Sequence, residues 1–149
     1  VPQISLSSGA TFPATVEEVV MANLYSKIGF MKFPKKEHKE KVKEALRIVN
    51  MEEYSKRLIG NLSGGQQQRV MIAKALVSDP KIIILDEPTT GIDAKSEEQL
   101  YALLNKLNKE SNITIIIVSH DFAKIQQYTN KIFVVENNKV SLMKNENEV

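Results

Sequence analysis

The stretch that decides the fold is Lys81-Ile82-Ile83-Ile84-Leu85-Asp86-Glu87-Pro88. Its short, unbroken apolar run is typical of a strand buried on both faces, in a parallel sheet covered by helices. Two carboxylates and a proline, which cannot extend the ladder, follow the run. Because ligands of open α/β sheets bind at the carboxyl ends of the strands, we expect Asp86 and Glu87 to face a crevice. Asp86 can hold a hard cation such as Mg²⁺, and Glu87 can accept a proton from water.

A second β-branched run, Ile113–Val118, also ends in polar residues, Ser119-His120-Asp121. If both runs are parallel strands of one sheet, their carboxyl ends meet at the same edge. A lone histidine is more often structural than catalytic. At this edge, beside two carboxylates, we expect His120 to belong to the site.

The segment Leu62-Ser63-Gly64-Gly65-Gln66 marks the start of a helix that runs to about Val77. Ser63 is placed to cap this helix. The two glycines carry no Cβ, so a phosphate can approach the backbone N–H groups closely at the positive end of the helix dipole. A glycine-containing N-cap is common and can also have a purely structural role.

The remaining chain predicts helices and one hairpin. We expect helices from Thr15, as N-cap, to about Lys27 and from about Lys36 to Val49. His38 falls among the alternating charges of the second helix, and we interpret it as a surface residue rather than a metal ligand. Further helices are predicted over Ala94–Lys109 and Phe122–Tyr128, and a hairpin across Asn137-Asn138.

Composition limits the function classes. The 149 residues suffice for a domain with a real core, and the net charge of +2 gives no electrostatic case for nucleic acid or an anionic membrane. There is no cysteine, which excludes disulfides and thiolate metal sites. No apolar run approaches the roughly 20 residues of a spanning helix. Any membrane association is therefore expected to go through a partner.

Together these motifs resemble the nucleotide-binding subunit of ATP-binding cassette (ABC) transporters. They come in the family's order: Val1-Pro2-Gln3 is similar to the entry to the Q-loop, Leu62–Gln66 to the signature motif, Ile82–Glu87 to the Walker B strand, Gly91-Ile92-Asp93 to the D-loop and His120 to the switch histidine. The run from Phe12 to Val20 resembles the zinc- and manganese-uptake branch, although it also fits a simple capped amphipathic helix.

The resemblance implies an α/β fold, the C-terminal part of a P-loop NTPase (RecA-type) cassette. Residues 1–3 would end the strand entering the Q-loop, residues 4–79 would form the helical subdomain with the signature motif, and residues 80–149 would complete the catalytic core. The sequence contains no G-x-x-x-x-G-K-[ST] phosphate-cradling loop and does not begin with Met. We therefore expect an N-terminally truncated cassette, without ATPase activity by itself.

The resemblance also implies roles for the site residues. Glu87 would be the general base, and His120 would hydrogen-bond the γ-phosphate of ATP. Asp86 and Gln3 would hold the Mg²⁺ region. The nucleotide bound by a second cassette would be contacted by Ser63, Gly64, Gly65 and Gln66, while Asp93 would lie at the interface of the two cassettes.

The implied function is ATP hydrolysis that powers import of a small solute, a divalent metal ion by the branch resemblance. Partners would be a second cassette, membrane-spanning permease subunits and an extracellular substrate-binding protein, with no nucleic acid. The location would be the cytoplasmic face of the membrane. One alternative is a non-transport ABC protein of translation or DNA metabolism. Another is a non-catalytic remnant that only pairs with another cassette.

Overall fold

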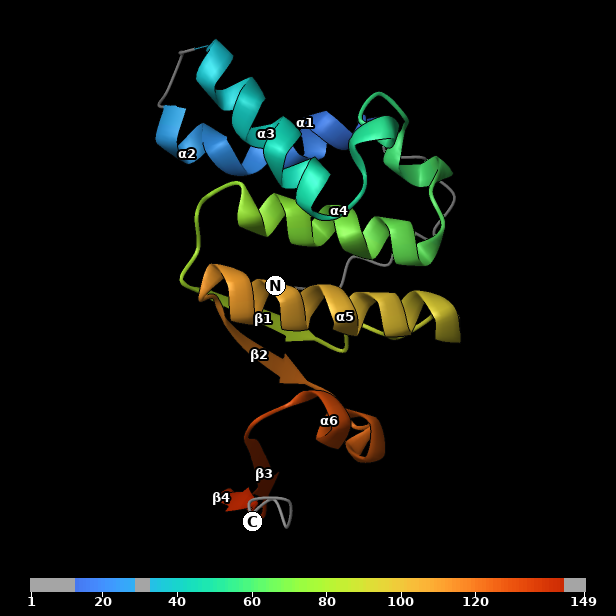
Figure 1. The fold of residues 1–149 in the computed structure, drawn as a ribbon, viewed down its shortest axis with the longest axis vertical. Coiled ribbons are helices and arrows are strands. Elements are labelled where there is room, and N and C mark those ends of the chain that lie inside the picture. The colour runs from blue at the N-terminus through green and yellow to red at the C-terminus, as the bar shows by residue number, and fades with distance from the viewer. Residues whose placement is uncertain (1–12, 29–32, 144–149) are drawn as a thin grey trace.

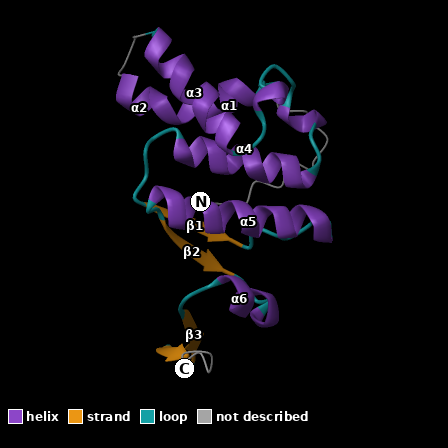
Figure 2. Ribbon diagram, viewed as in Figure 1, coloured by secondary structure: helices purple, strands orange, loops and turns teal. Residues whose placement is uncertain are grey.

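The computed structural model describes residues 13–28 and 33–143 and shows a mixed α/β arrangement (Figures 1 and 2). The first part is helical, with elements α1 (Val16–Met21), η1 (Ala22–Leu24), α2 (Tyr25–Ile28), α3 (Lys36–Ile48), η2 (Glu52–Tyr54), η3 (Ile59–Asn61) and α4 (Gly64–Leu76). Strands then alternate with helices: β1 (Ile82–Asp86), α5 (Ala94–Ser111), β2 (Thr114–Val118), α6 (Phe122–Tyr128), β3 (Ile132–Glu136) and β4 (Lys139–Met143).

The predicted first helix begins as expected but is not continuous. Thr15 caps α1 in a capping box with Glu18, and the apolar face buries Val16 and Val20. The helix then tightens into the 3₁₀ turn η1 before α2. Asn23, in that turn, is a poor helix former, and its side chain is held outside the segment by hydrogen bonds to the end of α4.

Helix α3 has nearly the predicted span and places Val42, Ala45 and Leu46 in the core. The prediction that His38 is a surface residue was wrong, because its side chain is only 16% exposed. Its Nδ1 accepts the backbone N–H of Lys35 at 2.9 Å. The imidazole satisfies a free N–H at the first turn of the helix and is partly buried there, which the charge pattern of the helix does not indicate.

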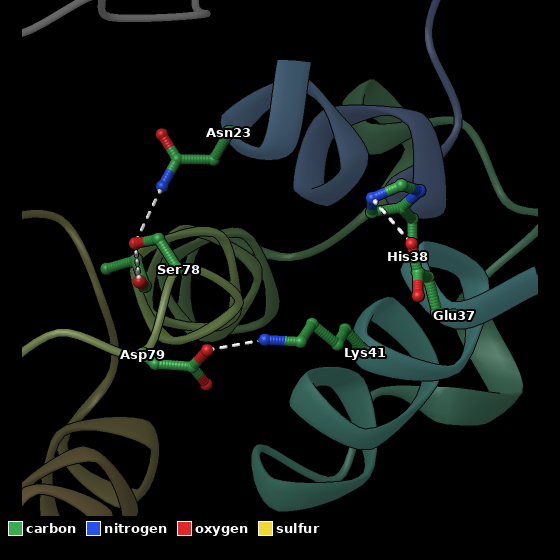
Figure 3. A network of polar contacts seen from close by, with 7 residues as sticks. Asn23, Glu37, His38, Lys41, Ser78 and Asp79 are labelled. Atoms are coloured by element: carbon green, nitrogen blue, oxygen red, sulfur yellow. Dashed lines mark hydrogen bonds and ion pairs between the residues drawn. The ribbon is translucent and has the colours of Figure 1, made fainter. Parts of the chain in front are cut away.

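Polar contacts from the helical part hold the turn that leads from α4 to β1 (Figure 3). The Asn23 amide donates to the Lys74 carbonyl at 2.8 Å and to Ser78 Oγ at 3.3 Å. Lys41 Nζ, on α3, donates to Asp79 Oδ2 at 2.5 Å. Thus η1 and α3 both fix the point where the chain enters the sheet.

Helix α4 lies between the α1–α3 layer and α5, and α5 runs along the strands (Figure 1). The buried side chains of α4 include Val70, Ala73 and Leu76. Those of α5 include Leu100, Leu104 and Leu107, whereas Leu103 is partly buried at the edge of the same stripe. Among the described residues, no helix has the length and apolar character of a membrane span.

Strands β1 and β2 pair in parallel, as predicted, with Asp86 opposite Val118. The expectation of burial on both faces was wrong: Ile83 is 4% exposed, but Ile84 is 69% exposed and Ile116 is also exposed. Side chains alternate across a strand, so one face packs on the helical core. No described element covers the other face, which also carries Ile82 and Val118.

The hairpin formed by β3 and β4 extends away from the helical layer at the far end of the molecule (Figure 1). Its turn, Asn137-Asn138, has positive φ at both residues, which is the requirement of a type I′ turn. Helix α6 has the predicted bounds and docks on α5 through a parallel stack of Tyr128 on Tyr101.

Candidate functional site

The carboxyl edge of the parallel strands brings Glu87 and His120 into contact. The Glu87 backbone N–H donates to the Val118 carbonyl at 2.9 Å, which extends the pairing one residue past β1. Glu87 Oε1 lies 2.8 Å from His120 Nδ1 and also accepts the His120 backbone N–H at 3.1 Å. The prediction that the two segments end at one sheet edge is confirmed.

Glu87 has an unusual backbone, with φ of 45° in the left-handed region. This conformation is costly for a residue with a Cβ. Here it is held on both sides, because the Glu87 carbonyl also accepts the Thr90 N–H at 3.2 Å. Strain of this kind is common at functional sites, where it aims a side chain. At this edge it directs the carboxylate toward His120.

The contact defines the protonation of the histidine. A carboxylate can only accept, so Nδ1 of His120 carries the hydrogen between the two groups. The hydrogen bond to Glu87, followed by the charge of that carboxylate, raises the pKa of His120 above its ordinary value. The His120 side chain is 85% exposed, so its Nε2 is open to a ligand, while that of Glu87 is 28% exposed.

Glu87 and His120 line a cleft of about 330 Å³ together with Thr89, Asp121 and Lys124. Lys124 Nζ, on α6, donates a short hydrogen bond to the carboxylate of Glu97 on α5.

The Lys124–Glu97 ion pair was not predicted from the sequence. A signal for it was present, because Glu97 stands three and seven positions before Leu100 and Leu104, within the apolar stripe of α5. A charged residue in such a stripe needs a partner.

Asp86 lies at the exposed end of β1. Within the described part of the chain, its carboxylate makes no hydrogen bond or ion pair, so its oxygens are open to a cation. No group of three or more metal-binding side chains occurs among these residues. A single exposed carboxylate is the kind of ligand that Mg²⁺ uses, with phosphates and waters completing its shell. Gln3, the other predicted ligand, lies outside the described residues.

The signature segment forms the capped start of the 13-residue helix α4. Ser63 Oγ accepts the Gln66 N–H at 3.3 Å, and Gln66 Oε1 accepts the Ser63 N–H at 3.0 Å. The predicted cap is thus confirmed, with Gln66 as its reciprocal partner. Gly64 faces Gly91 and Ile92 in the loop before α5, and Gly65 faces Ser96 in the first turn of α5, which Asp93 caps.

Asp93 is the N-cap of α5, a role that the sequence analysis did not assign to it. Its carboxylate accepts the Ser96 N–H at 3.0 Å and the Ser96 hydroxyl at 2.6 Å. These two hydrogen bonds, the hydroxyl first, hold the pKa of Asp93 below its usual value. The carboxylate is therefore charged and fixed at neutral pH.

The predicted site residues form two separate groups. Asp86, Glu87 and His120 gather at the sheet edge, whereas Ser63–Gln66 and Asp93 gather where α4 meets the start of α5. The signature residues do not line the cleft of Glu87 and His120.

Comparison with known proteins identifies the family of the chain. The sequence model described as "ABC transporter" matches residues 5–90, which is more than half of the chain. The chain belongs to the ABC transporter family. Among curated family members, the zinc uptake system ATP-binding protein ZurA of Listeria innocua is 44% identical over 135 residues, covering 91% of this chain and 52% of the relative. The manganese transport system ATP-binding protein MntB of Halalkalibacterium halodurans is 44% identical over 83% of this chain and 49% of its own length.

Solved ABC structures show the same fold. A metal-chelate type transporter in an inward-facing conformation matches with a TM-score of 0.86 and 27% identity, over 91% of this chain and 54% of that one. A bacterial ABC cassette solved as a dimer, MJ0796, matches with a TM-score of 0.71 and 31% identity, over 91% and 60%. This chain spans about half the length of the curated ABC relatives named above.

Proposed function

We propose that this chain is part of an ATP-hydrolysing cassette and supplies the sheet edge with Glu87 and His120 and the helix α4. The cassette powers uptake of a divalent metal ion, zinc or manganese. The observation that carries the proposal is the contact between Glu87 and His120 at the carboxyl edge of the parallel strands. Relatives named for zinc and manganese uptake, at 44% identity, support the choice of metal as the transported substrate.

Hydrolysis of a γ-phosphate needs a positioned water and stabilisation of spreading negative charge. Glu87 accepts the proton of that water. His120, held through Nδ1 by Glu87, offers Nε2 to a phosphate oxygen. Asp86 and Gln3 would hold Mg²⁺, which would supply positive charge to neutralise the phosphates. Because the His120 side chain is exposed, a nucleotide bound by other residues of the cassette has room beside it.

The second group of residues acts on a different nucleotide. Ser63, Gly64, Gly65 and Gln66 lie outside the cleft of Glu87 and His120, which leaves them available to ATP held by a second cassette, as the family resemblance implies. In this proposal Asp93 lies at the interface of the two cassettes. A relative of the same fold solved as a dimer supports such pairing. Permease subunits and a substrate-binding protein complete the transporter, with the cassettes at the cytoplasmic face of the membrane.

One observation favours a second candidate function for these residues by themselves. Its sequence holds no phosphate-cradling loop of the G-x-x-x-x-G-K-[ST] type. Alone, these residues would only pair with another cassette, and hydrolysis would require a P-loop supplied by further residues or another chain.

The test is ATP hydrolysis by the natural protein that carries this sequence. Glu87→Gln removes the base but keeps the shape of the side chain, so we expect turnover to fall by at least about 100-fold with ATP binding and pairing retained. Glu98→Gln is the matched control, because Glu98 is an exposed carboxylate on α5 outside the cleft. Near-normal turnover in Glu87→Gln would remove Glu87 from this role.

A further inference from the structure

Helix α4 begins in unusually close contact with the first turn of α5. At Gly65, a Cβ placed on the backbone would lie 2.7 Å from Ser96 Cβ and 2.8 Å from Ser96 Oγ, both too short for real atoms. The Cβ of Ser96 is fixed by its backbone, so no rotamer change relieves the 2.7 Å approach. Any residue larger than glycine at position 65 must therefore push α4 and α5 apart.

Ser96 is itself held in place. Its hydroxyl donates to Asp93 Oδ2 at 2.6 Å, and its backbone N–H donates to Asp93 Oδ1 at 3.0 Å. Further along the same pair of helices, Arg69 on α4 donates a short hydrogen bond to Gln99 on α5. The start of α4 therefore rests on a serine that is tied to the carboxylate of Asp93.

The neighbouring glycine is less constrained. A Cβ at Gly64 would lie 3.3 Å from the Gly91 carbonyl oxygen and 3.4 Å from Ile92 Cγ2, so the shift it requires is only a few tenths of an ångström. The two glycines of the signature segment thus differ in their surroundings within one chain. Only Gly65 meets a side-chain carbon that cannot rotate away.

We propose that Ser96 is a positioning residue that sets the distance between the signature segment Ser63–Gln66 and Asp93, and that Gly65 is glycine because Ser96 Cβ occupies the space beside it. This role rests on the proposed function, in which both groups serve ATP sites. In the sequence-based expectation, glycine is needed at position 65 only so that a phosphate can approach. In this proposal, the contact with Ser96 of the same chain also requires glycine there.

The experiment adds a Cβ at position 65 of α4 and removes the Cβ at position 96 of α5 in the natural protein. Gly65→Ala adds the Cβ, and we expect the melting temperature to fall by roughly 4–10 °C because the contact is overpacked. Adding Ser96→Gly to Gly65→Ala leaves only a 3.9 Å contact with Ser96 Cα, so the double variant should melt above Gly65→Ala. Adding Ser96→Ala keeps the Cβ and should not restore the melting temperature.

Function is measured on the same variants as ATP-dependent pairing and hydrolysis. We expect Gly65→Ala to lose both by at least about tenfold and the Gly65→Ala/Ser96→Gly protein to regain most of the loss, whereas Gly64→Ala loses less than Gly65→Ala. The proposal is overturned if Ser96→Gly fails to raise the melting temperature of Gly65→Ala, or if stability returns while pairing stays lost.

Failure of the proposed function is a separate outcome. If the unaltered protein neither pairs with ATP nor hydrolyses it, the proposed function fails. The melting temperatures of the same variants then still decide whether Ser96 sets the position of α4.

Discussion

Glu87 combines a left-handed backbone with the side chain that contacts His120. Replacing it with alanine or glycine removes the same contact, but only alanine keeps the Cβ that disfavours this backbone. We expect Glu87→Gly to be more stable than Glu87→Ala by about 1 kcal/mol. Chemical denaturation of both variants measures the difference. Equal stability, or a more stable alanine variant, would show that the backbone is not strained at this position.

The pKa of His120 is the second prediction at this scale. Because Glu87 raises the pKa of His120 above 6.5, the contact stabilises the fold fully below about pH 6.5. That contribution is lost as the pH rises through the folded-state pKa. Glu87→Gln should lower the pKa of His120, as followed by NMR titration, with a His38→Gln variant to assign the two imidazoles. An unchanged pKa in Glu87→Gln would contradict the contact.

At the scale of elements, the Lys124–Glu97 ion pair ties α6 to α5 beside the cleft. Glu97 is only 9% exposed, so Lys124→Met leaves a carboxylate without its cation in a mostly buried place. We expect Lys124→Met to lower the melting temperature by roughly 2–5 °C, and Glu97→Gln in the same protein to restore part of it.

The matched control is Lys106→Met on α5, the helix that carries Glu97. Lys106 pairs with Glu110 at 3.9 Å on the surface, where such pairs contribute little. Equal effects of the two lysine variants would mean that the tie to Glu97 carries no special stability.

The elements themselves were largely predictable, because their signals are local. The caps at Thr15 and Ser63 depend on residues three positions away, and α6 has its predicted bounds. The break in the first helix after Met21 and the partial burial of His38 were not predicted. Each depends on backbone or side-chain partners that the periodicity of the sequence does not indicate. The meeting of Glu87 with His120 was predictable, since parallel strands end at one edge.

At the scale of the whole molecule, the sheet has one covered and one open face, which an apolar run alone cannot distinguish. Ile83 is 4% exposed and Ile84 is 69% exposed. We therefore expect Ile83→Ala to cost about 2–5 kcal/mol of unfolding free energy in this chain, and Ile84→Ala less than about 1 kcal/mol. Urea denaturation of the two variants measures both values. Similar costs would show that both faces of β1 are covered in solution.

The stack of Tyr101 on Tyr128 has a spectroscopic consequence. Their ring centroids are 4.3 Å apart and their planes differ by 4°. The sequence has four tyrosines and no tryptophan, so no indole signal hides the phenol bands. Phenol rings held in one orientation by packing give a near-ultraviolet circular dichroism signal that freely rotating phenols lack. The circular dichroism of these tyrosines therefore reports whether α6, which follows His120 in the chain, is docked on α5.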